Sequence, residues 1–189
     1  MKNFKIVAVL FILSIVNVPN TNAQNIIEPK EGYTPQIGVL VSMMEDLRSR
    51  ITSSVEKMDA ESTDYLLDDN ANRIGAMILH LAATEKYYQV FTFENRGFNK
   101  EEEKEWMMAL ELGDKARKKI KGKSIKHYVA IWEEVRQETL SQLKTKDDKW
   151  LNSKIDNSSM NNHWAWYHVM EHQANHMGQI RLVQKRISE

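Results

Sequence analysis

Apolar residues recur every three or four positions along four long stretches of this chain, which is the spacing of one face of an α-helix. The stretches span residues 35–58, 71–93, 124–143 and 159–187. The first has a clear start signal, because Thr34 is a favoured N-cap residue and Pro35 suits the first helical position. No stretch shows the strict alternation of apolar and polar residues that is typical of a strand. The pattern therefore predicts four long amphipathic helices.

The connection between the second and third stretches is long and has features of its own. Asn99 and Glu102 have the spacing of a capping box, which predicts a short acidic helical segment after Asn99. The basic stretch from Lys115 to Lys123 is interpreted as a solvated helix end or loop. Four helices with one long connection predict an all-α protein, a four-helix bundle with a long crossover between its second and third helices.

Residues 1–23 have the pattern of a secretory signal peptide. Lys2 and Lys5 supply the positive charge, residues 6–16 form an unbroken apolar and small-residue run, and residues 21–23 provide a small-residue cleavage site. The apolar run is shorter than the roughly 20 residues that a membrane-spanning helix needs. We therefore expect cleavage near Ala23, no stable membrane anchor, and export to the periplasm or the exterior.

The composition of the expected mature domain, residues 24–189, restricts the chemistry that it can perform. The chain of 189 residues has 26 basic and 26 acidic side chains, and no basic patch stands out as a nucleic-acid-binding surface. It has no cysteine, which excludes disulfides, thiolate ligands and a cysteine nucleophile. Any metal site must therefore be built from histidine, aspartate or glutamate.

Three of the six histidines fall on predicted core-facing stripes. His172 and His176 lie about 40° apart on a helical wheel of the fourth helix, one turn from each other. His80 lies at the centre of the apolar face of the second helix. Burying three imidazoles without partners is costly, and one divalent cation bound by all three would satisfy them. Three protein ligands also leave a fourth position open, as in catalytic zinc sites. Pairing of the histidines in a metal-free core is the alternative.

The remaining histidines have less defined roles. His168 lies one turn before His172, so it is a candidate for a fourth ligand, a partner of a ligand, or a hydrogen-bonded residue at the edge of the bundle. It is also the best candidate for a proton carrier. His127 and His163 lie near helix starts and are interpreted as structural or exposed.

The same helical wheels make predictions about the residues around the histidines. Glu85 and Glu171 point away from the predicted ligand face, so neither is expected to bind the metal directly, and either could instead orient a partner helix. On the fourth helix, Trp166 and Gln173 are placed on the side opposite the histidines.

Two segments resemble the signatures of the DinB-like superfamily of bacterial four-helix-bundle metal proteins. Residues 170–180 read MEHQANHMGQI and resemble its last-helix signature, and residues 78–85 read ILHLAATE and resemble its second-helix signature. The resemblance extends over roughly residues 35–187 and implies a homodimeric bundle whose ligands correspond to His80, His172 and His176. Asn175 departs from the pattern, since many relatives carry a further histidine there.

The resemblance also implies a reaction class, because better-understood relatives transfer low-molecular-weight thiols or hydrolyse small amides. We therefore expect an exported protein that binds a divalent transition metal, with zinc as the first choice and nickel, iron, manganese or copper as others. A metal-dependent hydrolase or thiol transferase acting on a small molecule is the first hypothesis. A non-catalytic bundle that binds a metal or a small ligand is the alternative.

Overall fold

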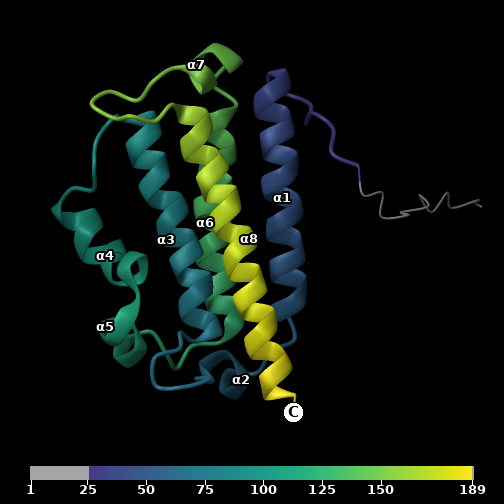
Figure 1. The fold of residues 1–189 in the computed structure, drawn as a ribbon, viewed down its shortest axis with the longest axis vertical. Helices are drawn as coiled ribbons and strands as arrows, with labels where there is room; N and C mark the ends of the chain where they lie inside the picture. Colours follow the sequence, from purple (N-terminus) through teal and green to yellow (C-terminus); the bar gives the residue numbers. More distant parts are fainter. Residues whose placement is uncertain (1–25, 189) are drawn as a thin grey trace, which may run out of the picture.

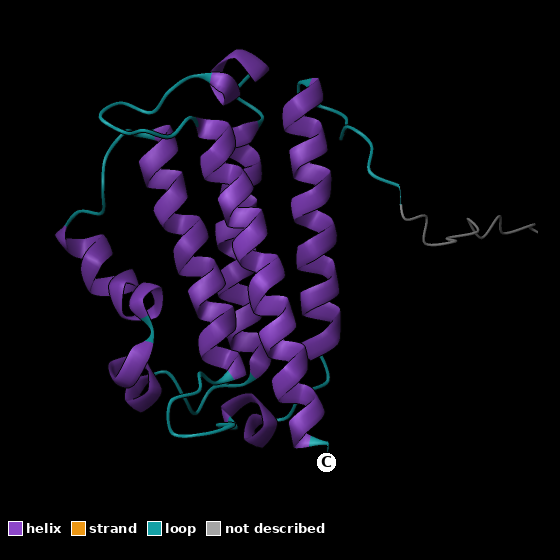
Figure 2. Cartoon of the chain, in the orientation of Figure 1, coloured by secondary structure: helices purple, strands orange, loops and turns teal. Residues whose placement is uncertain are grey.

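The computed structural model describes residues 26–188, which form an all-helical bundle (Figures 1 and 2). Its helices are α1 (Pro35–Val55), α2 (Ala60–Asp64), α3 (Ile74–Phe93), α4 (Lys100–Glu111), α5 (Gly113–Lys119), α6 (Ile125–Leu143), α7 (Asp148–Asn152) and α8 (Asn162–Ile187). The long helices α1, α3, α6 and α8 lie side by side, as the sequence pattern predicts. The predicted signal peptide lies outside the described residues.

The predicted helix boundaries are correct to within three residues, and the errors have local causes. The first helix ends at Val55 instead of residue 58, and the second begins at Ile74 instead of residue 71. The fourth begins at Asn162 because the side chain of Asn161 accepts a hydrogen bond from the Trp164 backbone N–H at 2.8 Å. Such an N-cap fixes where a helix starts.

The long crossover is itself helical. Asn99 and Glu102 form the predicted capping box at the start of α4, with each side chain bonded to the other residue's backbone N–H. The buried residues Trp106 and Ala109 belong to the apolar edge of α4, which packs against α3. The basic stretch that follows is carried mainly by α5. In Figure 1 these two helices lie outside the bundle, on the side of α3.

The start of α1 is capped from a distance. Thr34 is the N-cap residue, but its side chain makes no capping bond to its own helix. Instead Asp148 of α7 accepts hydrogen bonds from the backbone N–H groups of Gln36 and Ile37, at 3.1 and 3.2 Å, and from the Thr34 hydroxyl. A carboxylate at a helix N-terminus is stabilised by the free N–H groups and by the helix dipole. The connection before α8 is therefore tied to the first helix.

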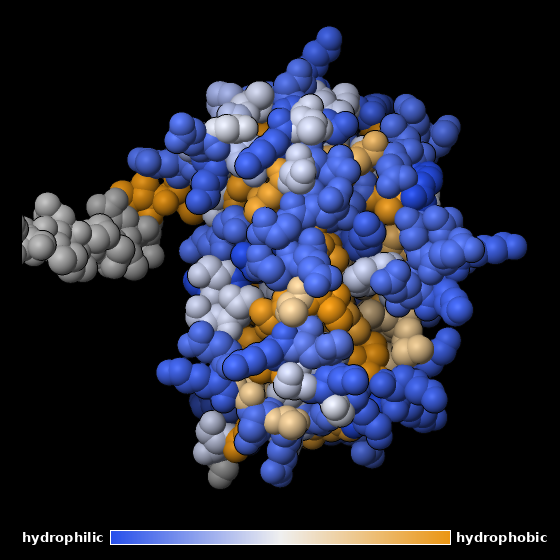
Figure 3. All heavy atoms as spheres, turned by 180° about the vertical axis from the view of Figure 1, so that it is seen from behind, coloured by the Kyte–Doolittle hydropathy of each residue, from blue (hydrophilic) through white to orange (hydrophobic). Residues whose placement is uncertain are grey.

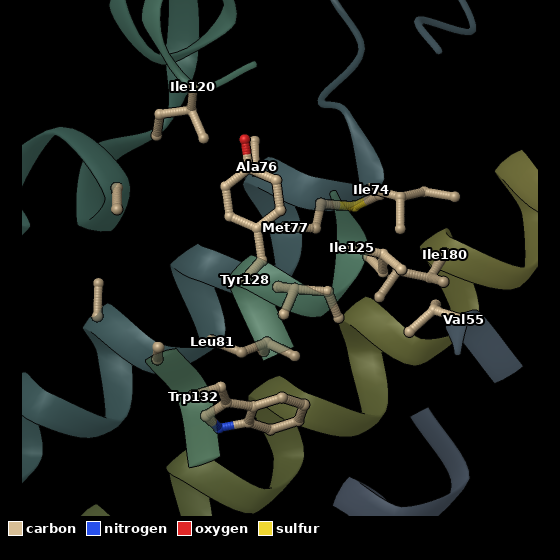
Figure 4. Close-up of a cluster of buried hydrophobic side chains, with 14 of the residues drawn as sticks. Val55, Ile74, Ala76, Met77, Leu81, Ile120, Ile125, Tyr128, Trp132 and Ile180 are labelled. Carbon is tan, nitrogen blue, oxygen red and sulfur yellow. The ribbon is translucent and has the colours of Figure 1, made fainter. Parts of the chain in front are cut away.

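Two apolar clusters fill the bundle. One lies towards the end where α2 and α5 are found, and includes Leu81, Trp132 and Ile180 (Figure 4). The other lies towards α7 and includes Met44 and Trp166. Burial of these side chains supplies most of the driving force for folding, at roughly 25 cal/mol per Å² of apolar surface.

A buried polar layer accompanies the two clusters. The side chains of Glu85 on α3 and Arg136 on α6 are both 0% exposed. Arg136 donates from Nε to Oε1 and from Nη2 to Oε2 of Glu85, at 2.7 and 2.8 Å, in the two-bond geometry that suits a guanidinium and a carboxylate. Trp132 and Thr139 also donate to Glu85, and Arg136 donates to Glu45 on α1. The layer joins α1, α3 and α6.

The surface follows the amphipathic pattern. Polar side chains cover most of the face turned away from the viewer in Figure 1, with apolar areas near its middle (Figure 3). Among the described residues, no helix combines the length and apolar character needed to cross a membrane.

The buried ion pair yields a stability prediction. Replacing Arg136→Met should lower the free energy of unfolding of the metal-free protein by about 3–5 kcal/mol, because Glu85 then keeps a buried charge without its partner. Urea unfolding followed by circular dichroism measures this loss. The control Arg50→Met removes an exposed pair with Asp46 and should cost at most about 1 kcal/mol.

The double variant Glu85→Leu/Arg136→Met tests whether the loss comes from the unpaired charge of Glu85. It removes both buried charges, so it should be more stable than Arg136→Met alone. A double variant less stable than the single one would show that the pair itself is not the source of the loss.

Candidate metal centre

Helices α3 and α8 bring three predicted site residues together. The two helices contact each other and run in opposite directions (Figure 1), so His80 of α3 faces His172 and His176 of α8. One ring nitrogen of each histidine lies within 4.8 Å of those of the other two. His80 is 7% exposed, His176 is 8% exposed, and His172 is half-buried. The cluster therefore lies just inside the surface of the bundle.

The crossover helix fixes the ring of His80. Nδ1 of His80 lies 2.9 Å from the carbonyl oxygen of Ala109, in the last turn of α4. Carbonyls in that turn have no partner within their own helix, and a carbonyl oxygen can only accept a hydrogen bond. Nδ1 of His80 therefore carries the proton, and the lone pair on Nε2 faces the other histidines. Metal-binding histidines are commonly oriented by such a bond.

Helix α4 ends abruptly at Glu111, because the backbone of the next residue leaves the helical conformation. Leu112, the residue that ends the helix, has a φ of 56°, which is unusual for a residue with a branched side chain. Because α4 stops there, the carbonyl group of Ala109 stays free for His80.

Hydrogen bonding within the cluster is incomplete. Nε2 of His80 and Nε2 of His172 lie 2.7 Å apart, so His172 donates to the lone pair of His80. This contact is the pairing expected of a metal-free core. However, Nδ1 of His176 is buried and has no hydrogen-bond partner among the described residues. Pairing alone therefore leaves a buried nitrogen of His176 unsatisfied, which is costly in a metal-free core.

Burial keeps these imidazoles neutral, which is the form that binds metals. It lowers the pKa of His172 to about 3, with further lowering by the neighbouring His176, His80 and His168. It lowers the pKa of His176 to about 4, with His80 adding to the effect. It also lowers the pKa of His80, against the opposing effect of the bond to Ala109. Near neutral pH the cluster can bind a cation without first losing protons.

His168 lies beside the cluster, outside the group of three. Its ring centroid is 5.8 Å from that of His172, and its Nδ1 lies 3.4 Å from a carboxylate oxygen of Glu171. The ring stacks on Trp164 at 5.2 Å with an interplanar angle of 6°. Of the other histidines, His127 is exposed and His163 is half-buried. The structure brings neither of these two into the group of three histidines that could hold a metal ion.

One sequence prediction about α8 is wrong. Trp166 is 0% and Gln173 is 1% exposed, so both belong to the buried face and not to the opposite side. The buried arc is wide because α8 packs against α1 as well as α3. The histidines lie at one edge of this arc, which a helical wheel drawn around His172 does not reveal.

Glu85 has the kind of role that its position predicts, orienting a partner helix, but the sequence identified neither Arg136 as its partner nor the depth of the pair. It makes no contact that would suit a metal ligand, as predicted, and instead anchors the buried polar layer. It also accepts a long hydrogen bond, 3.4 Å, from Nε2 of Gln173, the neighbour of His172 in the chain. The sequence signal was its position five residues after His80, on one of the two helices that carry the histidine cluster.

Three imidazole nitrogens without a thiolate can hold a divalent ion such as zinc, nickel, copper or iron. The orphaned nitrogen of His176, the oriented ring of His80 and the neutral state of all three side chains fit such an ion. The cluster therefore could bind a metal ion, whose identity depends on availability as well as on the ligands.

Comparison with known proteins agrees with this arrangement. The sequence model of the family described as mycothiol-S-transferase matches residues 39–188, which include all three histidines of the cluster. A search of curated proteins found no match. Because the match covers most of the chain, this protein belongs to the mycothiol-S-transferase family, one of the DinB-like families.

Proposed function

We propose that this protein is a metal-dependent transferase that joins a low-molecular-weight thiol to a small electrophile, with the ion held by His80, His172 and His176. The observation that carries the proposal is the convergence of these three imidazoles from α3 and α8. The description of the family supports a thiol as one of the two substrates. We propose zinc as the metal, because three protein ligands leave a position open in its usual tetrahedral geometry.

The reaction is a substitution at carbon. The thiol sulfur forms a bond to a carbon atom of the electrophile, the bond from that carbon to the leaving group breaks, and the leaving group departs with its electron pair. The proton of the thiol is released. A bound divalent ion supplies electrostatic stabilisation of the thiolate, which is the nucleophilic form of a thiol.

The protein's own residues prepare this step. The carbonyl group of Ala109 holds the His80 ring so that Nε2 is free to bind. The burial of His80 and His176 restricts the access of water from the bundle side. We propose that His168 accepts the proton of the thiol and passes it to solvent or to Glu171, which is supported by its half-buried place next to His172 and its contact with Glu171.

We also propose that the protein is exported and forms a homodimer. The charge and apolar pattern of residues 1–23 supports export, and the likeness to DinB-like proteins supports a dimer, which light scattering would measure. Outside the cytoplasm, the thiol substrate has to be one that is available there.

The metal site gives the first functional prediction. Protein prepared without a histidine tag should carry about one divalent ion per chain, and His80→Ala, His172→Ala and His176→Ala should each lose it, because each removes one of three ligands. Elemental analysis by mass spectrometry measures the content. The control His127→Ala changes an exposed histidine and should keep the ion. Full metal content in all three variants would refute the assignment.

The transfer reaction gives the second functional prediction. Metal-loaded protein should accelerate the reaction of mycothiol, glutathione or cysteine with iodoacetamide above the uncatalysed rate, and His176→Ala should not. The chain has no cysteine, so the added thiol is the only one in the assay. His168→Gln should keep the metal and slow turnover by roughly 10²-fold, the usual contribution of a proton-transferring residue. Stoichiometric metal with no acceleration for any thiol would favour the alternative, a non-catalytic metal-binding bundle.

Export gives a third prediction. Protein isolated from the cells that produce it naturally should begin at Gln24 and be found in the periplasmic or secreted fraction, which N-terminal sequencing of each fraction would establish. An intact N-terminus in the cytoplasmic fraction would contradict the proposal.

A further inference from the structure

A line of aromatic rings leads away from the histidine cluster. We name it the aromatic strip, and it consists of His168 and Trp164 on α8 together with Tyr88, Tyr87 and Phe91 on α3. The His168 ring lies 5.8 Å from that of Tyr88, between centroids, and 5.8 Å from that of His172. The strip therefore starts next to the candidate metal ligands and follows the seam between the two helices that carry them.

The rings of the strip lie against one another in a way that leaves flat surfaces. His168 and Trp164 are parallel within 6°, and Tyr87 and Phe91 are parallel within 14° at a centroid distance of 5.8 Å. Tyr88 joins the two pairs through its contacts with His168 and Phe91. Stacked and tilted arrangements of this kind are favourable between aromatic rings, and a further planar ring can extend them.

The strip is partly accessible to solvent although its rings are large. Trp164 is 47% exposed, and the other four members are half-buried. A single exposed aromatic residue needs no explanation, but an exposed ring beside several partly exposed ones keeps a larger apolar surface in contact with water. Trp166, two residues from Trp164, is fully buried, so α8 has room for tryptophan inside the bundle. Trp164 also lines a surface groove of about 690 Å³ next to the α7–α8 connection.

A buried hydroxyl lies on the same side of α3 as the strip. Thr84 is one helical turn after His80 and one turn before Tyr88, so it lies between the cluster and the strip along the helix. It is 6% exposed, and its Oγ1 has no hydrogen-bond partner among the described residues. An unsatisfied buried hydroxyl costs free energy, and a polar group of a bound ligand would satisfy it.

We propose that the aromatic strip binds the second substrate, a small electrophile with a planar aromatic ring, and holds its reacting carbon beside the histidine cluster. The inference rests on the proposed thiol transfer and names the class of its electrophile. The ring of the electrophile lies against Trp164 and Tyr88, and the substitution follows the balance given above: a sulfur–carbon bond forms, and the leaving group departs from the ring carbon with its electron pair. Aromatic substrates are then favoured over small aliphatic ones.

The test compares two electrophiles with the same thiol and the same metal-loaded protein. 1-Chloro-2,4-dinitrobenzene carries a planar ring, and iodoacetamide does not. Trp164→Ala and Tyr88→Ala should each raise KM for the aromatic electrophile by about 5-fold, the size expected for the loss of one aromatic contact. KM for iodoacetamide and the metal content should stay unchanged.

Tyr167 supplies the matched control. It is an aromatic residue on α8 with 45% exposure, close to that of Trp164, and it lies about 100° around the helix from His168. Tyr167→Ala should therefore leave KM for both electrophiles unchanged. An unchanged KM for the aromatic electrophile in the strip variants, or an equal rise for both electrophiles, would overturn the proposal.

A separate measurement distinguishes failure of the strip from failure of the proposed function. If metal-loaded protein accelerates neither reaction, the transfer proposal fails, and binding is then measured directly with 2,4-dinitrophenol, which quenches tryptophan fluorescence. Saturable quenching that weakens in Trp164→Phe and Tyr88→Ala but not in Tyr167→Ala supports an aromatic-binding surface. Quenching that is the same in all variants contradicts it.

Discussion

The buried ion pair between Glu85 and Arg136 is the interaction on which the rest of this bundle depends. Charges this deep are tolerated only when every hydrogen-bonding position is used, and here Trp132 and Thr139 complete the set around the carboxylate. That requirement restricts how α3 and α6 can slide or rotate against each other. Gln173 extends the restriction to α8. The histidines lie on α3 and α8, so the geometry of the candidate metal centre follows from a polar layer that contains none of its ligands.

Much of the fold could be predicted because its signals are local. The spacing of apolar residues identified all four long helices, and the capping box at Asn99 identified the start of α4. The same periodicity placed His172 and His176 one turn apart on one stripe, which the structure confirms as the edge of the buried face of α8. Helical geometry connects residues three and four positions apart, so a sequence shows these relations directly.

What the sequence did not show depends on contacts between distant segments. The burial of Trp166 and Gln173 follows from α8 packing on two helices at once, which widens its buried arc beyond a single stripe. Asp148 caps a helix more than a hundred positions earlier in the chain. The partner of His80 is a backbone carbonyl, and every residue has one, so no residue type marks it.

The hydrogen bond that His80 donates to the carbonyl oxygen of Ala109 gives the crossover a role beyond connecting two helices. The segment that holds this carbonyl lies outside the bundle and contributes no candidate ligand, yet it selects which nitrogen of His80 faces His172 and His176. Evolution can therefore adjust the affinity of the centre by changing the length or the docking of a peripheral segment while all three histidines stay the same. Two bundles with the same three histidines would then differ in their affinity for a metal ion if their crossovers dock differently against the second long helix.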